Sequence, residues 1–150
     1  MPRAAGFSLF ELLLVVALIA LLGAVAMPML GAGSGGAELR ASARSLAAGL
    51  RAARTEALSR QRETVLSVDV ERRRFQVGEG EVVQLPEDIG LKLHTARSEL
   101  RGEGLGGIRF FPDGSATGGH IDVDGASAGF TVNVDWLTGA ISIQAREVQP

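Results

Sequence analysis

One unbroken apolar block near the amino end constrains this chain more than any other feature. Residues 12–30 are apolar apart from Gly23 and Pro28, and no Asp, Glu, Lys or Arg occurs from residue 12 to residue 37. About 20 apolar residues are needed for a helix to cross a bilayer. The block therefore predicts a membrane-spanning segment and argues against a simple soluble cytoplasmic protein.

The composition leaves little material for catalysis or metal binding. The chain has no cysteine and no tyrosine, and its only histidines are His94 and His120, neither in a recognisable nucleophile motif. Disulfides, thiolate nucleophiles and Cys-ligated zinc are thereby excluded. We predict a protein that is not an enzyme, with no cofactor and no metal site. Asp122, Asp124 and Asp135 could gather around calcium, but we favour solvated acidic residues beside turns.

The segment of residues 37–62 has the pattern of an amphipathic helix. It carries six arginines against two glutamates, and its apolar residues recur at spacings of three and four. The predicted buried stripe consists of Leu39, Ala43, Leu46, Leu50, Ala53 and Ala57. The arginines lie mostly off this stripe, and no aromatic residues are interleaved with them. We interpret them as a polar face available for salt bridges rather than a nucleic-acid site.

The two helical segments are separated by the glycine-rich residues 31–36, which follow Pro28. Glycine costs about 1 kcal/mol and proline about 3 kcal/mol in a helix interior. We expect a kink at Pro28 and a break in the helix at residues 31–36.

Residues 63–150 change to a hydrophobic period of two, and acidic residues outnumber basic ones by fourteen to eight. Strands are expected at residues 64–70, 74–77, 81–85, 91–95, 108–111, 120–123, 130–135 and 140–145. Such spacing favours an antiparallel sheet or small sandwich, so we expect a β head on a helical stalk. Trp136 and Phe130 are expected to anchor its core. The glycine-rich residues 102–107 are expected to form a surface loop.

Three interpretations compete for residues 1–30. Arg3, the apolar block and the sequence Ala24-Val25-Ala26 fit a cleaved secretory signal peptide. A plain uncleaved anchor needs only the apolar length. The third interpretation starts from Glu11, the one charge at the head of the block. A charge in a membrane is costly and usually serves a purpose, although a position near the interface and a helix amino end lowers that cost.

The surroundings of Glu11 resemble the leader of type IV prepilins. Residues 5–12 read Ala-Gly-Phe-Ser-Leu-Phe-Glu-Leu, and Pro28 follows Phe7 by 21 residues. A short basic leader ending in Gly, followed by Phe and then by Glu at the start of an apolar helix, is the pattern of that superfamily. The resemblance implies that a prepilin peptidase removes residues 1–6 by cutting after Gly6 and methylates the new α-amine of Phe7.

The same resemblance assigns a role to the apolar helix. Residues 7–30 would form the transmembrane and assembly helix, and Glu11 would pair with the α-amine on Phe7 of a neighbouring subunit, because a buried charge is far costlier alone than paired. Subunit packing is expected to use Leu12, Leu13, Val16, Ile19 and Ala20, a face that the lipid bilayer covers before assembly.

A second resemblance lies in the head. Residues 108–119 (Ile-Arg-Phe-Phe-Pro-Asp-Gly-Ser-Ala-Thr-Gly-Gly) and 134–139 (Val-Asp-Trp-Leu-Thr-Gly) look like the general secretion pathway protein H family, whose head region is shared with FimT- and FimU-type minor pilins. Ala140 departs from the arginine that this pattern leads us to expect. The resemblance implies an α+β, type IV pilin-like fold with a long N-terminal helix and an antiparallel β head of two small sheets.

The function implied by this family is that of a minor pseudopilin of type II secretion, a structural subunit that helps export folded proteins across the outer membrane. Its expected partners are other major and minor pseudopilins, the prepilin peptidase and an inner-membrane assembly platform. The expected location is the bacterial inner membrane, with a single pass and the head in the periplasm, followed by incorporation into the pseudopilus. The alternative is a minor pilin of a type IV pilus, including one that serves DNA uptake.

Overall fold

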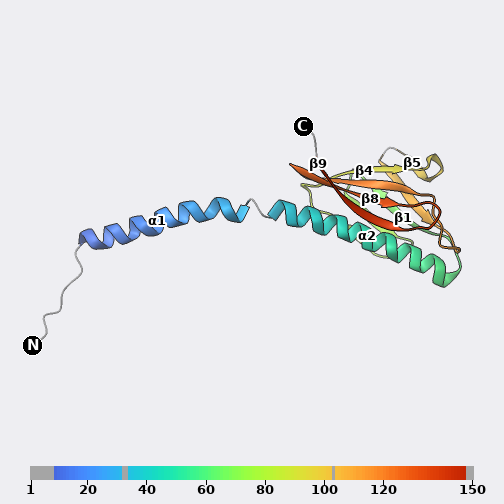
Figure 1. The fold of residues 1–150 in the computed structure, drawn as a ribbon, viewed down its shortest axis with the longest axis horizontal. Helices are drawn as coiled ribbons and strands as arrows, with labels where there is room; N and C mark the ends of the chain where they lie inside the picture. The colour runs from blue at the N-terminus through green and yellow to red at the C-terminus, as the bar shows by residue number, and fades with distance from the viewer. Residues whose placement is uncertain (1–8, 32–33, 103, 148–150) are drawn as a thin grey trace, which may run out of the picture. The chain divides into compact units, whose positions relative to one another are not determined.

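The computed structural model describes residues 9–31, 34–102 and 104–147, so the predicted cleavage site at Gly6 and Phe7 lies outside the described residues. The chain divides into two units, one ending at Ser34 and one beginning at Gly35. The first unit contains the helix α1 (Leu9–Gly31). The second contains all but the first residue of α2 (Ser34–Arg60), and antiparallel strands follow it along the chain (Figure 1).

The helix α1 consists mostly of Leu, Val, Ile and Ala, which fall on every side of it. It continues through Pro28 to Gly31, and α2 begins at Ser34. Within the expected glycine-rich break, the described residues 31 and 34–36 are thus helical, and residues 32–33 lie outside the described part. The kink at Pro28 stays a prediction.

Among the residues that the structure describes, no helix combines the length and the apolar character needed to cross a membrane.

The helix α2 buries the apolar stripe that its sequence period predicts. All six stripe residues, from Leu39 to Ala57, are buried in the core. The approach to the strands is close at Gly49, where an added Cβ would lie 2.7 Å from the ring atom Cε2 of Phe75. Burial of a 3.6-residue stripe is what stabilises a helix of this kind, because propensity alone is marginal.

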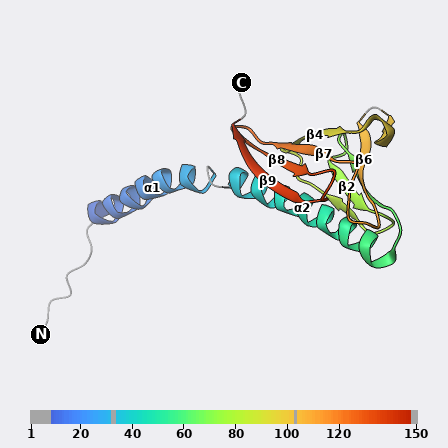
Figure 2. The same cartoon turned by 45° about the vertical axis from the view of Figure 1, so that its right-hand side comes forward.

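The strands form two antiparallel sheets, as the fold class predicted. The first has the order β3-β2-β1-β6-β5 and the second β4-β7-β8-β9. The strands of the first sheet are β1 (Thr64–Asp69), β2 (Arg74–Val77), β3 (Val82–Gln84), β5 (Leu100–Gly102) and β6 (Leu105–Phe110). Those of the second are β4 (Gly90–Thr95), β7 (Gly119–Asp124), β8 (Ala128–Val134) and β9 (Ile141–Glu147). Figure 2 shows α2 running alongside the strands.

Inward-facing side chains of both sheets and of α2 share one core. Leu66 of β1 and Phe110 of β6 come from the first sheet, Ile121 of β7 and Val132 of β8 from the second, and Leu46 from α2; all are fully buried. Because side chains alternate between the two faces of a strand, His120 and Asp122 of β7 lie on the face opposite to the core residues Ile121 and Val123, where Asp122 is nevertheless buried.

Two expectations for the head are wrong. Trp136 is 65% exposed instead of filling the core, because it lies in the turn between β8 and β9, whereas Phe130 is partly buried and packs against the core. The glycine-rich residues 102–107 are not simply a surface loop, since Gly106 and Gly107 are buried inside β6. A Cβ on Gly107 would lie 2.8 Å from the carbonyl oxygen of Leu66, so glycine lets two strands approach there.

The 3-10 helix η1 (Arg97–Glu99) and the short strand β5 were not expected from the sequence. Both follow β4 and lead into β6. They carry no alternating apolar pattern, and their place is decided by contacts with β6 instead.

Candidate functional site

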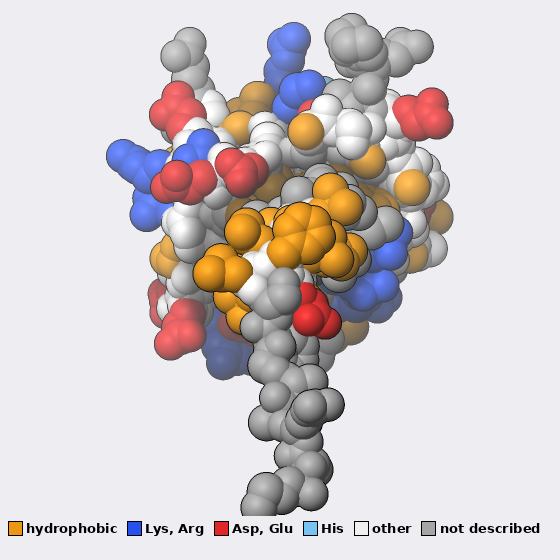
Figure 3. Space-filling model, turned by 90° about the vertical axis from the view of Figure 1, so that its left-hand side faces the viewer, with side chains coloured by type: hydrophobic (Ala, Val, Ile, Leu, Met, Phe, Trp, Pro, Cys, Tyr) orange, Lys and Arg blue, Asp and Glu red, His pale blue; other side chains and the backbone are white. Residues whose placement is uncertain are grey.

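The side chains of α1 are described for residues 9–21, and all of them are exposed. This exposure is unusual because nearly all of these residues are apolar and only one is charged. Large apolar side chains such as Leu12, Val16 and Ile19 expose more than half of their surface, and Figure 3 shows hydrophobic side chains gathered at this end of the chain. A continuous exposed apolar surface marks a contact with another protein or with a membrane. The helix α1 is therefore the candidate assembly site.

Glu11 lies in the first turn of α1 and is the only charged residue of that helix. Free backbone N–H groups at a helix amino end favour an anion at this position. The five predicted packing residues, Leu12, Leu13, Val16, Ile19 and Ala20, are all exposed, so their side chains are available for a contact with another subunit. That contact stays a prediction.

In the head, the two sequence motifs that resemble the protein H family lie side by side. The amide of Ala116 donates a hydrogen bond of 2.8 Å to the carbonyl oxygen of Trp136. Arg54 of α2 donates from Nε to the carbonyl oxygen of Gly114 (3.2 Å) and from Nη2 to that of Thr138 (2.9 Å). One arginine therefore connects both turns to α2, a role that the sequence alone did not reveal.

Each of these turns also has its own aspartate. Asp113 Oδ1 accepts hydrogen bonds from the hydroxyl and the amide of Ser115, at 2.6 and 2.9 Å, and these bonds lower the pKa of Asp113. Asp135 Oδ1 accepts from the amide and the hydroxyl of Thr138, both at 2.8 Å, and the pKa of Asp135 is lowered in the same way. The Pro-Asp-Gly and Trp-Leu-Thr-Gly motifs are thus structural, as their residue types indicated.

A second polar cluster connects η1 to β6. Arg109 donates from Nε to Glu99 Oε1 (3.0 Å) and from Nη1 to Glu63 Oε2 (2.8 Å). The Glu99 side chain is only 6% exposed, and its hydrogen bond raises the pKa of Arg109. This part-buried ion pair connects the unexpected η1 segment to β6.

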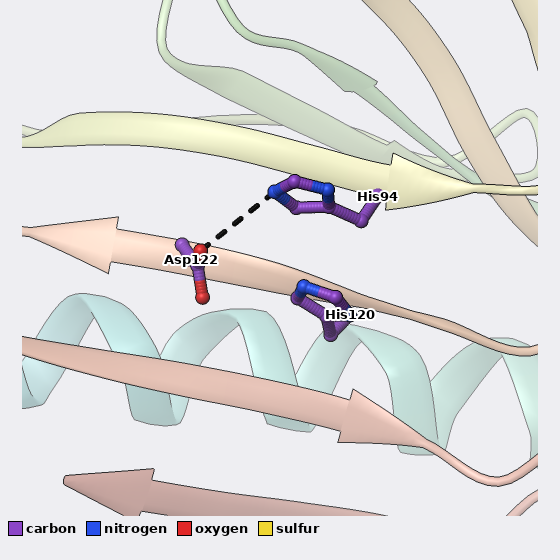
Figure 4. Close-up of side chains that lie close together, drawn as sticks. All are labelled: His94, His120 and Asp122. Atoms are coloured by element: carbon purple, nitrogen blue, oxygen red, sulfur yellow. Dashed lines mark ion pairs between the residues drawn. The ribbon is translucent and has the colours of Figure 1, made fainter. Parts of the chain in front are cut away.

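The three aspartates considered for calcium do not come together. Asp122 and Asp124 lie on β7, where both face Arg146, whereas Asp135 belongs to the turn at the other end of that sheet. Asp122 instead lies beside the two histidines. His94 Nε2 is 3.8 Å from Asp122 Oδ2, and the rings of His94 and His120 stack with centroids 4.3 Å apart (Figure 4).

Solved structures show which class of fold this is. The chain matches the type IV minor pilin FimU of Pseudomonas aeruginosa with a TM-score of 0.58 at 16% identity, over 75% of this chain and 93% of that one. It matches the minor pseudopilin EpsH from the type 2 secretion system of Vibrio cholerae with a TM-score of 0.58 at 16% identity, over 72% and 97%. The fold is therefore the pilin-like fold that was predicted.

Sequence comparison then separates the families that share this fold. Residues 42–139 match the model of the type II transport protein GspH family. The chain is 38% identical to the type II secretion system protein H of Xanthomonas campestris pv. campestris over 136 residues, which cover 91% of this chain and 80% of that protein. The chain belongs to the GspH family, and the type II secretion interpretation is better supported than a type IV pilin.

Proposed function

We propose that this chain is a minor pseudopilin that joins the type II secretion pseudopilus through α1 and acts as a structural subunit in protein export. The observation that carries the proposal is Glu11, a single acidic residue in the first turn of an otherwise apolar and exposed helix. Membership of the GspH family supplies the secretion context. In this proposal the α1 helices of the subunits form the interior of the filament, and the β head lies on its outside.

Glu11 has a physical task in such a filament. When α1 packs among the helices of other pseudopilins, the carboxylate leaves water, and an unpaired buried charge costs several kcal/mol. Cleavage after Gly6 would give Phe7 a free α-amine that stays cationic when methylated. Pairing Glu11 with this amine on a neighbour removes the cost only at one axial offset, so the pair selects the register between subunits.

The apolar block also supports a location of the subunit in the inner membrane before assembly. Residues 7–30 would lie in the inner-membrane bilayer, which covers Leu12, Leu13, Val16, Ile19 and Ala20 until other subunits replace the lipid. Prepilin peptidase and the assembly platform would act on the chain there, with the head in the periplasm. Pro28 and the glycine-rich residues 31–36 are proposed as the point where the helix bends or opens as it leaves the bilayer.

Substitution of Glu11 tests the assembly role. Glu11→Ala and Glu11→Leu are expected to leave a processed, membrane-bound subunit that no longer cross-links to other pseudopilins, with reduced export. Glu38→Ala, which removes an exposed glutamate of α2, is the matched control and should keep assembly. Unchanged cross-linking and export in both Glu11 variants would contradict the proposal.

The mass of the mature protein tests the processing step. Cleavage by prepilin peptidase gives a chain that starts at a methylated Phe7, whereas an ordinary signal peptidase acting after Ala24-Val25-Ala26 gives one that starts at Met27. Intact-mass measurement on protein from membranes distinguishes these two products. A chain that begins at Met27 would lack α1's first turn and could not use Glu11.

The FimU match keeps the type IV minor pilin as a second candidate, because its TM-score equals that of EpsH. At 16% identity, both matches establish the fold and not the function. Deletion of the gene in its own host separates the two functions. Loss of secreted enzymes with intact pili supports secretion, and the reverse result supports the pilus.

A further inference from the structure

We propose that His94, His120 and Asp122 form a binding site for a first-row transition-metal ion such as Zn²⁺. One imidazole nitrogen of each histidine and one carboxylate oxygen of Asp122 lie within 4.8 Å of one another. This inference is independent of the assembly proposed for α1, since all three residues lie in the second sheet of the head. It departs from the expectation, drawn from the composition, that the chain has no metal site.

The strand register creates this cluster. His94 of β4 lies directly opposite His120 of β7, and Asp122 follows two residues later on β7. Opposite residues of antiparallel strands share one face, and so do residues two apart on one strand. The three side chains therefore point together from the outer face of the sheet (Figure 4). Because His94 and His120 lie 26 positions apart in the sequence, no local spacing motif could have revealed the site.

The distances suit a metal after small side-chain movements. Zinc binds nitrogen and carboxylate oxygen at about 2.0–2.2 Å, so its tetrahedral ligands lie roughly 3.4 Å from one another. His94 Nε2 and Asp122 Oδ2 are already 3.8 Å apart. The His94 side chain is 54% exposed and can rotate without disturbing the core. Turning the two stacked rings slightly out of parallel would direct one nitrogen of each toward the ion.

The charges around the cluster favour Asp122 as the ligand rather than Asp124. Lys92 Nζ lies 3.3 Å from Asp124 Oδ2, and Arg146 Nη2 forms an ion pair with Asp124 Oδ1, so Asp124 is already paired with two cations. Arg146 reaches Asp122 Oδ2 only at 3.6 Å. Asp122 is mostly buried and its other oxygen, Oδ1, accepts a 2.7 Å hydrogen bond from the hydroxyl of Thr131. The hydrogen bond to Oδ1 fixes the carboxylate, and Oδ2 lies 3.8 Å from His94 Nε2 and 3.6 Å from Arg146 Nη2, so an ion bound at Oδ2 would replace this long contact with Arg146.

The donor set indicates which metals would bind. Two imidazoles and one carboxylate suit Zn²⁺, Cu²⁺, Ni²⁺ or Fe²⁺, whereas Ca²⁺ and Mg²⁺ prefer six or more oxygen ligands. Three protein ligands leave a coordination position for water or for a group of a partner. Since β4 is an edge strand of its sheet, a bound ion would fasten that edge to β7.

Zinc titration of the full-length chain, purified in detergent without a polyhistidine tag, tests this site by calorimetry. We expect one Zn²⁺ per chain, and His94→Asn, His120→Asn and Asp122→Asn should each weaken binding about tenfold or more. The control Glu87→Gln alters an exposed carboxylate in the turn before β4 and should bind like the unmodified chain. No heat of binding at millimolar zinc, or equal binding by His94→Asn, would overturn the proposal.

Two further measurements distinguish a loss of metal binding from a loss of folding in the variants. Zinc should raise the melting temperature of the unmodified chain and of Glu87→Gln, but not that of the three site variants, each compared with its own metal-free value. The Cu²⁺ electron paramagnetic resonance spectrum should show two imidazole nitrogens, which only His94 and His120 can supply in this chain. A spectrum with oxygen donors alone would mean an adventitious ion and overturn the site.

Discussion

Arg54 Nη2 donates a 2.9 Å hydrogen bond to the carbonyl oxygen of Thr138, a residue 84 positions further along the chain. The same guanidinium donates from Nε to the carbonyl oxygen of Gly114. The helix α2 thereby holds together the two turns that carry the motifs shared with the protein H family. This contact gives those motifs a physical reason, since their glycines and aspartates shape turns whose carbonyl groups meet one arginine.

Arg54→Ala is expected to destabilise the head by about 1–3 kcal/mol, because the part-buried carbonyl group of Gly114 and the exposed one of Thr138 both lose their donor. Urea denaturation followed by circular dichroism measures this free energy of unfolding. Arg51→Ala, on an exposed position of the same helix, should change it by less than about 0.5 kcal/mol. Equal losses in the two variants would show that the contacts of Arg54 with the two turns contribute nothing specific.

Gly139→Ala is expected to disrupt the same contact from the other side. Gly139 has φ +62°, and an added Cβ would lie 2.2 Å from the carbonyl oxygen of Gly114 and 2.8 Å from Arg54 Nε. Strain of this kind costs on the order of 1–3 kcal/mol. Gly36→Ala meets open space in α2 and should stabilise by up to about 1 kcal/mol. Thermal denaturation measures the melting temperature of both variants. A Gly139→Ala protein that melts at the same temperature as the unmodified chain would contradict the described turn.

Glu99→Ala should be more damaging than Glu63→Ala, although both glutamates contact Arg109. It removes the buried partner of the part-buried Arg109 guanidinium, which keeps only Glu63, so the loss should be about 1–3 kcal/mol. Glu63 contacts the same arginine, but its side chain is 52% exposed, so Glu63→Ala should cost no more than about 1 kcal/mol. Chemical denaturation compares the two; a smaller loss for Glu99→Ala would refute the ranking.

Asp135 makes the stability of the head depend on pH in the acid range. Hydrogen bonds from the amide and hydroxyl of Thr138 lower the pKa of Asp135 below its ordinary value of 3.8. The stabilisation is therefore complete above pH 3.8 and is lost as the pH falls through the lowered pKa. In Asp135→Asn, the fall in melting temperature between pH 5 and pH 3 should be smaller than in the unmodified chain. An identical pH profile would exclude this role.

Trp136→Ala tests whether the tryptophan lies outside the core. Because the side chain is largely exposed, its loss should cost less than about 1 kcal/mol. Phe110→Ala removes a fully buried ring and should cost about 3–5 kcal/mol. Tryptophan fluorescence of the unmodified chain should show a solvent-exposed maximum, since Trp136 is the only tryptophan. A blue-shifted maximum would place the ring in an apolar environment instead.

Several parts of this fold could be predicted because the sequence encodes them locally. The buried stripe of α2 follows from its 3.6-residue period, and each of its six residues is buried. The strands β1 and β2 follow from the alternating runs predicted at residues 64–70 and 74–77, and their register pairs Val68 with Phe75. The family motifs were likewise visible as short runs, and the GspH match confirms them.

Other parts depended on which distant segments meet. Trp136 was expected in the core because of its residue type, but core positions also require a place on an inward-facing strand, and Trp136 lies in a turn. Arg54 resembled the other arginines of its helix until the two turns were placed beside it. The cluster of His94, His120 and Asp122 depends on the pairing of β4 with β7.

The amino-acid sequence by itself determined the apolar helix with its single Glu11, the amphipathic α2 and the pilin-like class, since periods and short motifs act within a few residues. Only the tertiary structure decided the partner of Arg54, the exposure of Trp136 and the meeting of the two histidines with Asp122. The physical reason is that strand register depends on the packing of both sheets and α2 around one core, and no short stretch of the chain contains that information.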